Sequence, residues 1–169
     1  MTSKQWIATA DNCDIVNATA EDGGTAIAGH SGIATAGNGG TAVAGDFGVA
    51  TAGDDGTAVA GDIGTATAGC NGTATAGHLG AATAGDDGTA VAGDFGVAVA
   101  GYGGTATAGA YGKITITFWC FKELVFKTVA GHVGYDGILP NVPYHVHEST
   151  TPRCPTKFSS SFKLTRRNV

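Results

Sequence analysis

The pair His145 and His147 is the first candidate for chemistry in this sequence, because both imidazoles would lie on one face of a β-strand. His132 or Cys154 could add a ligand, and a metal-dependent activity in this C-terminal part is our third functional hypothesis. Protein metal sites normally use three or four ligands at set spacings. The sequence has no such set, so we predict neither a metal nor a cofactor.

Aspartates next to glycine are the second candidate, and four of them form what we term the acidic corners: Asp54, Asp55, Asp86 and Asp87. A regular row of carboxylates could bind cations or mimic the phosphates of DNA. A duplex carries one charge per about 1.7 Å, however, and these aspartates are far sparser. Asp beside Gly is typical of turns, where the side chain bonds the local backbone. We therefore expect turn residues, and no nucleic-acid partner.

Motifs of catalysis are missing from the sequence. It contains no nucleophile elbow, no P-loop lysine and no H-E-x-x-H, and the run Gly-Tyr-Gly-Gly at 101–104 does not lead into a helix as a phosphate loop should. The cysteines are far apart and form no C-x-x-C pair: Cys13, Cys70, Cys120 and Cys154. We expect a non-enzymatic protein with free thiols in a reducing compartment.

Charge is divided unevenly along the 169 residues. Residues 1–112 contain eleven Asp or Glu and one Lys, whereas residues 113–169 contain three Asp or Glu and eight Lys or Arg. The N-terminus has no secretion signal, and no run of about 18 apolar residues could cross a membrane. We expect an acidic body with a basic tail. We also expect a cytoplasmic protein, located in the cytoplasm of the host cell or in the virion if a phage encodes it.

A repeat of eight residues must position all of these side chains. Fourteen octads, such as DGTAVAGD at 55–62, divide the chain from Ile7 to Phe118 without gaps. Thr, Val or Ile alternates with Ala as in a β-strand, and two Gly per octad at about 1 kcal/mol each disfavour a helix. The residue that opens each octad alternates between small or polar and mostly apolar. The true unit is therefore sixteen residues.

These periods predict an all-β protein, a flattened parallel β-solenoid of seven sixteen-residue coils with a small C-terminal β cap. We expect an N-terminal cap at 1–6, the solenoid at 7–118, a β capping segment at 119–148 with a turn at 134–137, and a basic extended tail at 149–169. Trp6, Ile7 and Ile15 are candidate cap residues at one end, and Ile114 and Ile116 at the other.

The alanines of each octad are expected inside, as Ala58 and Ala60 with Gly56, because a buried unpaired Thr hydroxyl would cost about 1–3 kcal/mol. Thr and Val then form a flat outer face, with files about 7 Å apart and coils about 4.8 Å apart. Its residues are Thr25, Thr41, Val43, Thr57, Val59, Thr73, Thr75, Thr89, Val91, Thr105 and Thr107. Such a lattice is typical of ice-binding surfaces, although Thr and Val also simply favour strands. Ice binding is our second functional hypothesis.

One further file recurs every sixteen residues along a single edge: Phe47, Ile63, Leu79, Phe95 and Tyr111. If these side chains turn inward, the thin Ala core must widen on that side into a wedge. If they turn outward, they expose an apolar stripe that a second copy would cover. Both alternatives are open from the sequence, and we favour the outward one, with a homodimer.

Two resemblances accompany the repeat. The octads, written AGDDGTAV or AGDFGVAT, resemble the AGYGST-x-T octapeptides of bacterial ice nucleation proteins, although the regular Tyr, Ser and Gln are missing. The segment Val129-Ala130-Gly131, Val133-Gly134, Asp136-Gly137-Ile138 and Pro140, followed by Tyr144, is similar to one that follows Gly/Ala-rich octads in a family of uncharacterised phage and prophage proteins. That resemblance implies a phage or bacterial origin, and no activity.

The function that we expect is therefore that of a structural or macromolecular interaction module, which works through its repetitive surface. Inhibition of a host factor is one such role. The expected partners are a second copy of the chain and a host protein, with ice as the alternative and no membrane.

Overall fold

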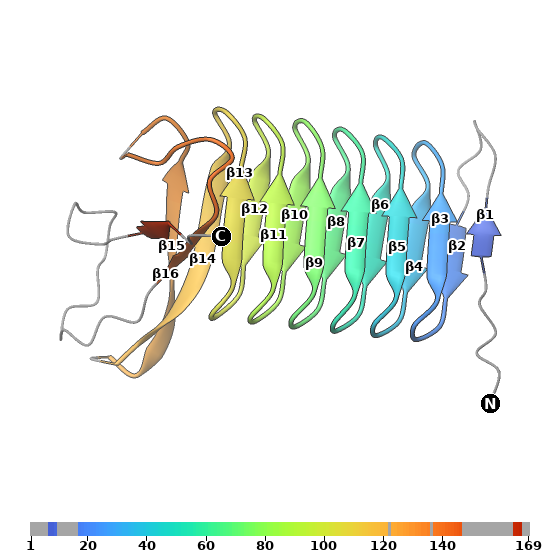
Figure 1. Ribbon diagram of the computed structural model, residues 1–169, viewed down its shortest axis with the longest axis horizontal. Coiled ribbons are helices and arrows are strands. Elements are labelled where there is room, and N and C mark those ends of the chain that lie inside the picture. The colour runs from blue at the N-terminus through green and yellow to red at the C-terminus, as the bar shows by residue number, and fades with distance from the viewer. Residues whose placement is uncertain (1–6, 10–16, 122, 136, 147–163, 167–169) are drawn as a thin grey trace.

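The computed structural model describes residues 7–9, 17–121, 123–135, 137–146 and 164–166, with side chains from 17 to 146. This part of the chain contains strands and turns but no helix, and so no helix that could span a membrane. Two sheets pack face to face and form a rod, and the chain winds from one sheet to the other (Figure 1). The expected all-β solenoid is confirmed.

Nine strands form the first sheet, here called sheet A: β1 (Ile7–Thr9), β3 (Thr25–Ala28), β5 (Thr41–Ala44), β7 (Thr57–Ala60), β9 (Thr73–Ala76), β11 (Thr89–Ala92), β13 (Thr105–Ala108), β16 (Tyr144–Val146) and β17 (Leu164–Arg166). Eight strands form sheet B: β2 (Asn17–Ala20), β4 (Ile33–Ala36), β6 (Val49–Ala52), β8 (Thr65–Ala68), β10 (Ala81–Ala84), β12 (Val97–Ala100), β14 (Lys113–Cys120) and β15 (Val125–His132).

Each repeat strand pairs in parallel with the strand one coil further on, as Thr57 with Thr73. About six regular turns follow from β2, and at about 4.8 Å per turn they span roughly 29 Å. The first coil is irregular, because Ile7 pairs with Thr25, eighteen residues away and not sixteen. The gap-free division into octads therefore does not hold in the first coil. Because the coil has two extra residues, an even number, the alternation of inward and outward positions stays in phase with the later strands.

The core of the rod consists of alanine. Ala58 is fully buried and Ala60 nearly so, whereas Thr57 and Val59 point outward and are half-buried. The inward assignment of alanine is confirmed. In β14 the same inward places hold Ile114 and Ile116, which are also buried, so larger side chains fill the core at this end as expected.

Type II turns close each coil, as in Gly53-Asp54-Asp55-Gly56. The N–H of Gly56 donates to the carbonyl of Gly53 at 3.2 Å, and Asp55 has a φ of +55°. Asp55 also donates its N–H to the carbonyl of Cys70 on the next coil at 2.8 Å. A side chain at Gly56 would lie 2.8 Å from the Cβ of Ala52, which explains the glycine. The backbone ladder thus continues through the corners.

The C-terminal cap begins inside the last long strand. β14 runs across the boundary expected at 118/119, turns at Phe121–Leu124 and pairs with β15 as an antiparallel hairpin. β15 covers the last edge of sheet B, and β16 continues sheet A by pairing antiparallel with β13. Antiparallel strands thus cover the edges of the last coil, so that these edges are not open to pairing with another chain.

The predictions for both ends of the chain concern residues that lie largely outside the described ones. Trp6 and Ile15 lie outside them, as does the N-terminal segment 1–6, and the side chain of Ile7 is not described. From the tail at 149–169 only β17 is described, and it pairs antiparallel with β16.

The cysteines differ from expectation at one described position. Cys120, at the end of β14, is disulfide-bonded, so the prediction of free thiols is wrong there. Its side chain is buried beside the hairpin, in a segment that the octad pattern does not cover. Cys70 is free and exposed, and Cys13 and Cys154 lie outside the described residues.

Candidate interaction surfaces

The apolar edge is the row of turns that leads from sheet A to sheet B. Its third turn position holds Ser31 in the first turn and five large apolar residues in the turns that follow: Phe47, Ile63, Leu79, Phe95 and Tyr111. All five have left-handed backbones, with φ between +56° and +58°, and exposed fractions of 48–68%. The side chains therefore point away from the rod, and the alternative of a wedge-shaped core is wrong.

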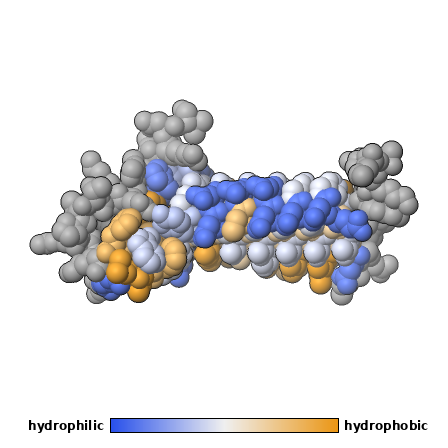
Figure 2. Space-filling view, turned by 90° about the horizontal axis from the view of Figure 1, so that it is seen from below, coloured by the Kyte–Doolittle hydropathy of each residue, from blue (hydrophilic) through white to orange (hydrophobic). Residues whose placement is uncertain are grey.

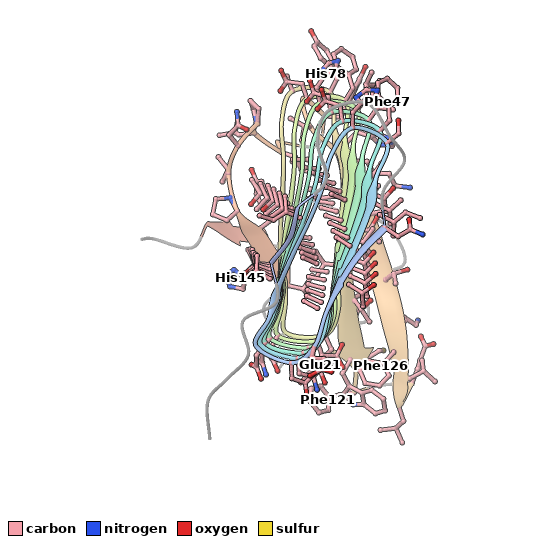
Figure 3. The ribbon with its side chains drawn as sticks, turned by 90° about the vertical axis from the view of Figure 1, so that its right-hand side faces the viewer. Glu21, Phe47, His78, Phe121, Phe126 and His145 are labelled. Atoms are coloured by element: carbon pink, nitrogen blue, oxygen red, sulfur yellow. The ribbon has the colours of Figure 1, made fainter. Side chains whose placement is uncertain are left out.

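The acidic edge is the opposite row of turns, which leads from sheet B back to sheet A (Figure 3). Its third turn position holds Gly23, Gly39, Asp55, Asn71, Asp87 and Gly103. Gly, Asn and Asp adopt a left-handed backbone at little cost, whereas Phe, Leu and above all the β-branched Ile do not. The turn geometry alone therefore gives no reason for the large residues of the apolar edge.

Aromatic contacts connect neighbouring coils along the apolar edge. The rings of Phe95 and Tyr111 stack with centroids 5.1 Å apart. His30 contacts Phe47 edge-on at 5.3 Å, and His78 contacts Phe95 in the same way at 5.6 Å. These two histidines are corner residues that support the aromatic file.

A second ladder uses the carboxylates at the second turn position. The N–H of Asp62 donates to Asp46 Oδ1 at 2.9 Å, and the N–H of Cys70 donates to Asp54 Oδ1 at 2.8 Å. Asn38 accepts the N–H of Asp54 in the same way at 3.0 Å. Each partner is sixteen residues away, so these side chains bond the next coil and not the local backbone that the sequence suggested.

The glycine before each of these residues makes room for the ladder. A Cβ on Gly69 would meet the Oδ1 of Asp54 and would lie 2.7 Å from its backbone nitrogen. The carboxylate reaches the next coil across the space that this glycine leaves empty. The seventh place of the octad is therefore glycine because of a contact between coils.

The four acidic corners have two different environments. All four are exposed, but Asp54 and Asp86 each accept a backbone N–H of the next coil, whereas Asp55 and Asp87 occupy left-handed positions. The same row of turns also holds Glu21, Asp22, Asn38 and Asn71, and Figure 2 shows a hydrophilic stripe along the rod. Asp54 and Asp86, two of the four acidic corners, thus stabilise the stacking of one coil on the next.

The flat faces carry outward files in register. On sheet A the first file is threonine in six successive strands: Thr25, Thr41, Thr57, Thr73, Thr89 and Thr105. The last of them is only 8% exposed, on β13 beside β16. Sheet B carries a comparable threonine file in five successive strands: Thr19, Thr35, Thr51, Thr67 and Thr83. Its members are half-buried or exposed.

The tip of the β14–β15 hairpin is a further apolar surface, which sequence reasoning missed. Phe121, Leu124, Val125 and Phe126 are 44–69% exposed, and Phe126 contacts Trp119 and Tyr102 edge-on. The tip projects at the side of the acidic edge (Figure 3). The available signal was the run 117–120, which lacks the glycines that turn every earlier coil.

The candidate metal ligands are placed apart in the topology. His132 ends β15 in sheet B, and His145 lies on β16 in sheet A. His147 and Cys154 lie outside the described residues. Among the residues with described positions, no three His, Cys, Asp or Glu side chains group around a point where a metal ion could sit.

Fold and surfaces together describe a β-solenoid with one apolar edge, one acidic edge and two flat faces. Comparison with protein-family models, curated proteins and solved structures gave no match for this chain.

Proposed function

We propose that this protein is a non-enzymatic interaction module, a rod that binds a macromolecular partner along its apolar edge. One observation carries the proposal: five large apolar side chains stand exposed at turn positions with left-handed backbones. A left-handed residue other than Gly, Asn or Asp costs roughly 1–2 kcal/mol. Strain of this kind concentrates where residues serve function.

The extent of the apolar edge suits a protein partner. Its five side chains span four coil spacings, or about 19 Å. Each is about half exposed, and a large aromatic side chain presents about 200 Å² when fully accessible, so the exposed area is about 500 Å². Apolar patches of about 300–600 Å² on soluble proteins are often functional. No lysine or arginine lies in these turns, so an anionic partner has little to bind there.

Replacing all five residues by Asn tests the proposal, since Asn accepts a left-handed backbone. We expect the variant to keep the far-UV circular dichroism of the parent and to lose binding to any partner captured from the source cells, measured by calorimetry with the purified partner. Asp55→Asn with Asp87→Asn is the matched control on the other edge and should bind like the parent. If the five-Asn variant binds the same partners with unchanged affinity, the apolar edge is not the interaction surface.

Ice binding is a second candidate, because the outward Thr and Val files on sheet A stand in register over six strands without a charged residue. Thermal hysteresis and ice recrystallisation measurements test it. We expect Thr57→Lys with Thr89→Lys to abolish such activity, and the five-Asn variant to retain it. Absence of activity in the parent protein excludes this candidate.

A further inference from the structure

We infer that the partner of the apolar edge is a second copy of this chain, packed side by side about a twofold axis. The inference rests on the proposed function, because it names an occupant for the same surface. It adds that each copy covers the aromatic file of the other along its full length.

The spacing of the file favours a second copy over other partners. One apolar side chain recurs per coil, at about 4.8 Å, over five coils. A helix advances about 5.4 Å per turn and would drift by roughly 2 Å over the four intervals. Alternate residues of an extended strand are about 6.8 Å apart and drift faster. Another rod of the same pitch matches at every step.

The file is also self-complementary. Leu79 stands at its centre, with Phe47 and Ile63 on one side and Phe95 and Tyr111 on the other. Leu79 therefore faces its copy whether the two rods run parallel or antiparallel, and all five side chains are covered in either case. A twofold contact needs such a surface, in which the same patch serves both partners.

The area is sufficient for a dimer. About 500 Å² of apolar side chain per copy gives about 1,000 Å² in total, which is the lower limit for a specific interface. The contacts already present along the file, such as the stacked Phe95 and Tyr111, hold these side chains in place before association. Less side-chain freedom is then lost on binding.

Charge beside the file gives the association a distinctive salt dependence. Asp46, Asp62 and Asp94 lie in the same turns, with His30, His78 and Tyr111 as the other ionisable groups of that row. Two copies bring their carboxylates together, so salt should strengthen the dimer by screening the repulsion. A basic partner that paired with these carboxylates would instead bind more weakly as salt rises.

Sedimentation velocity of the full chain at low and high salt tests the inference. We expect a dimer whose dissociation constant falls as salt is raised, and rises about a hundredfold or more in the five-Asn variant. A parent that is monomeric at every concentration overturns the inference, as does a dimer that the five-Asn variant retains. If the parent is monomeric and the five-Asn variant no longer binds the partner that the parent binds, the inference of a dimer is wrong but the proposed function stands. If the parent is monomeric and the five-Asn variant binds that partner as well as the parent does, both the inference and the proposed function are wrong.

A thiol-specific cross-linker gives the geometry. In a Cys70→Ser background, whose own cross-linking is the baseline, Leu79→Cys should add a link to its copy through a short bismaleimide, because Leu79 lies at the centre of the file. Asn71→Cys, in the same coil but on the acidic edge, is the matched control and should remain uncoupled. A dimer in which Asn71→Cys couples and Leu79→Cys does not overturns the inference.

Discussion

Ala58→Leu probes the alanine core directly. Ala58 is fully buried, and its in-register neighbours Ala42 and Ala74, one coil away on either side, are fully buried as well. A leucine adds three carbons to a place where the coils above, below and opposite are already in contact. No inward space exists for them unless the two sheets separate.

The magnitude follows from this packing. Extra methylene groups in a filled core typically cost about 1–3 kcal/mol, and a site enclosed on every side belongs at the upper end, about 3 kcal/mol. For a chain of this size each kcal/mol lowers the melting temperature by about 2–4 °C. We therefore expect a decrease of about 6–12 °C.

Thermal and urea unfolding followed by circular dichroism measure the effect. Val59→Leu is the matched control, since the neighbouring side chain points outward and is half-buried. It should change the stability by less than about 0.5 kcal/mol. Equal melting temperatures for the two variants would refute the assignment of alanine to a closely packed interior.

Three further predictions concern the corners and the cap. Asp54→Ala should lower the free energy of unfolding in urea by about 1 kcal/mol, because it removes the acceptor for the Cys70 N–H. Asp54→Asn should leave the stability unchanged, because Asn38 already accepts the corresponding N–H one coil earlier. Equal losses in the two variants would contradict the side-chain ladder. Gly69→Ala should lower the melting temperature more than Gly23→Ala. A Cβ at Gly69 meets the backbone of Asp54, whereas a Cβ at Gly23 has open space and only the positive φ is unfavourable. The reverse order would show that φ, and not crowding between coils, sets the requirement for glycine in the turns. Truncation after Gly112 should produce assemblies larger than the parent in light scattering, because the edges of β12 and β13 lose β14, β15 and β16; a truncated chain with the mass distribution of the parent would show that these strands do not act as a cap.

The repeat itself was readable because the local chemistry is unambiguous. Alternation of Ala with Thr or Val has the period of a strand, and paired glycines mark each turn, so strands, register and inward face all follow from neighbouring residues. The same simplicity predicted Ile114 and Ile116 as the place where the core changes. Sequence reasoning was weaker where the repeat ends: the hairpin turn at Phe121–Leu124 and the extra residues of the first coil interrupt the period on which the prediction relied.

The sequence by itself determined the solenoid, its sixteen-residue coil and its alanine interior, because each depends on contacts that recur at a fixed spacing. Only the tertiary structure decided the direction of Phe47 and its equivalents, since the left-handed turn that points them outward is shared with glycine and aspartate on the other edge. It also decided that Asp46 and Asp54 bond the following coil. A carboxylate next to glycine is compatible with either a local or a distant donor, and the stacking of one coil on another brings the distant one within reach.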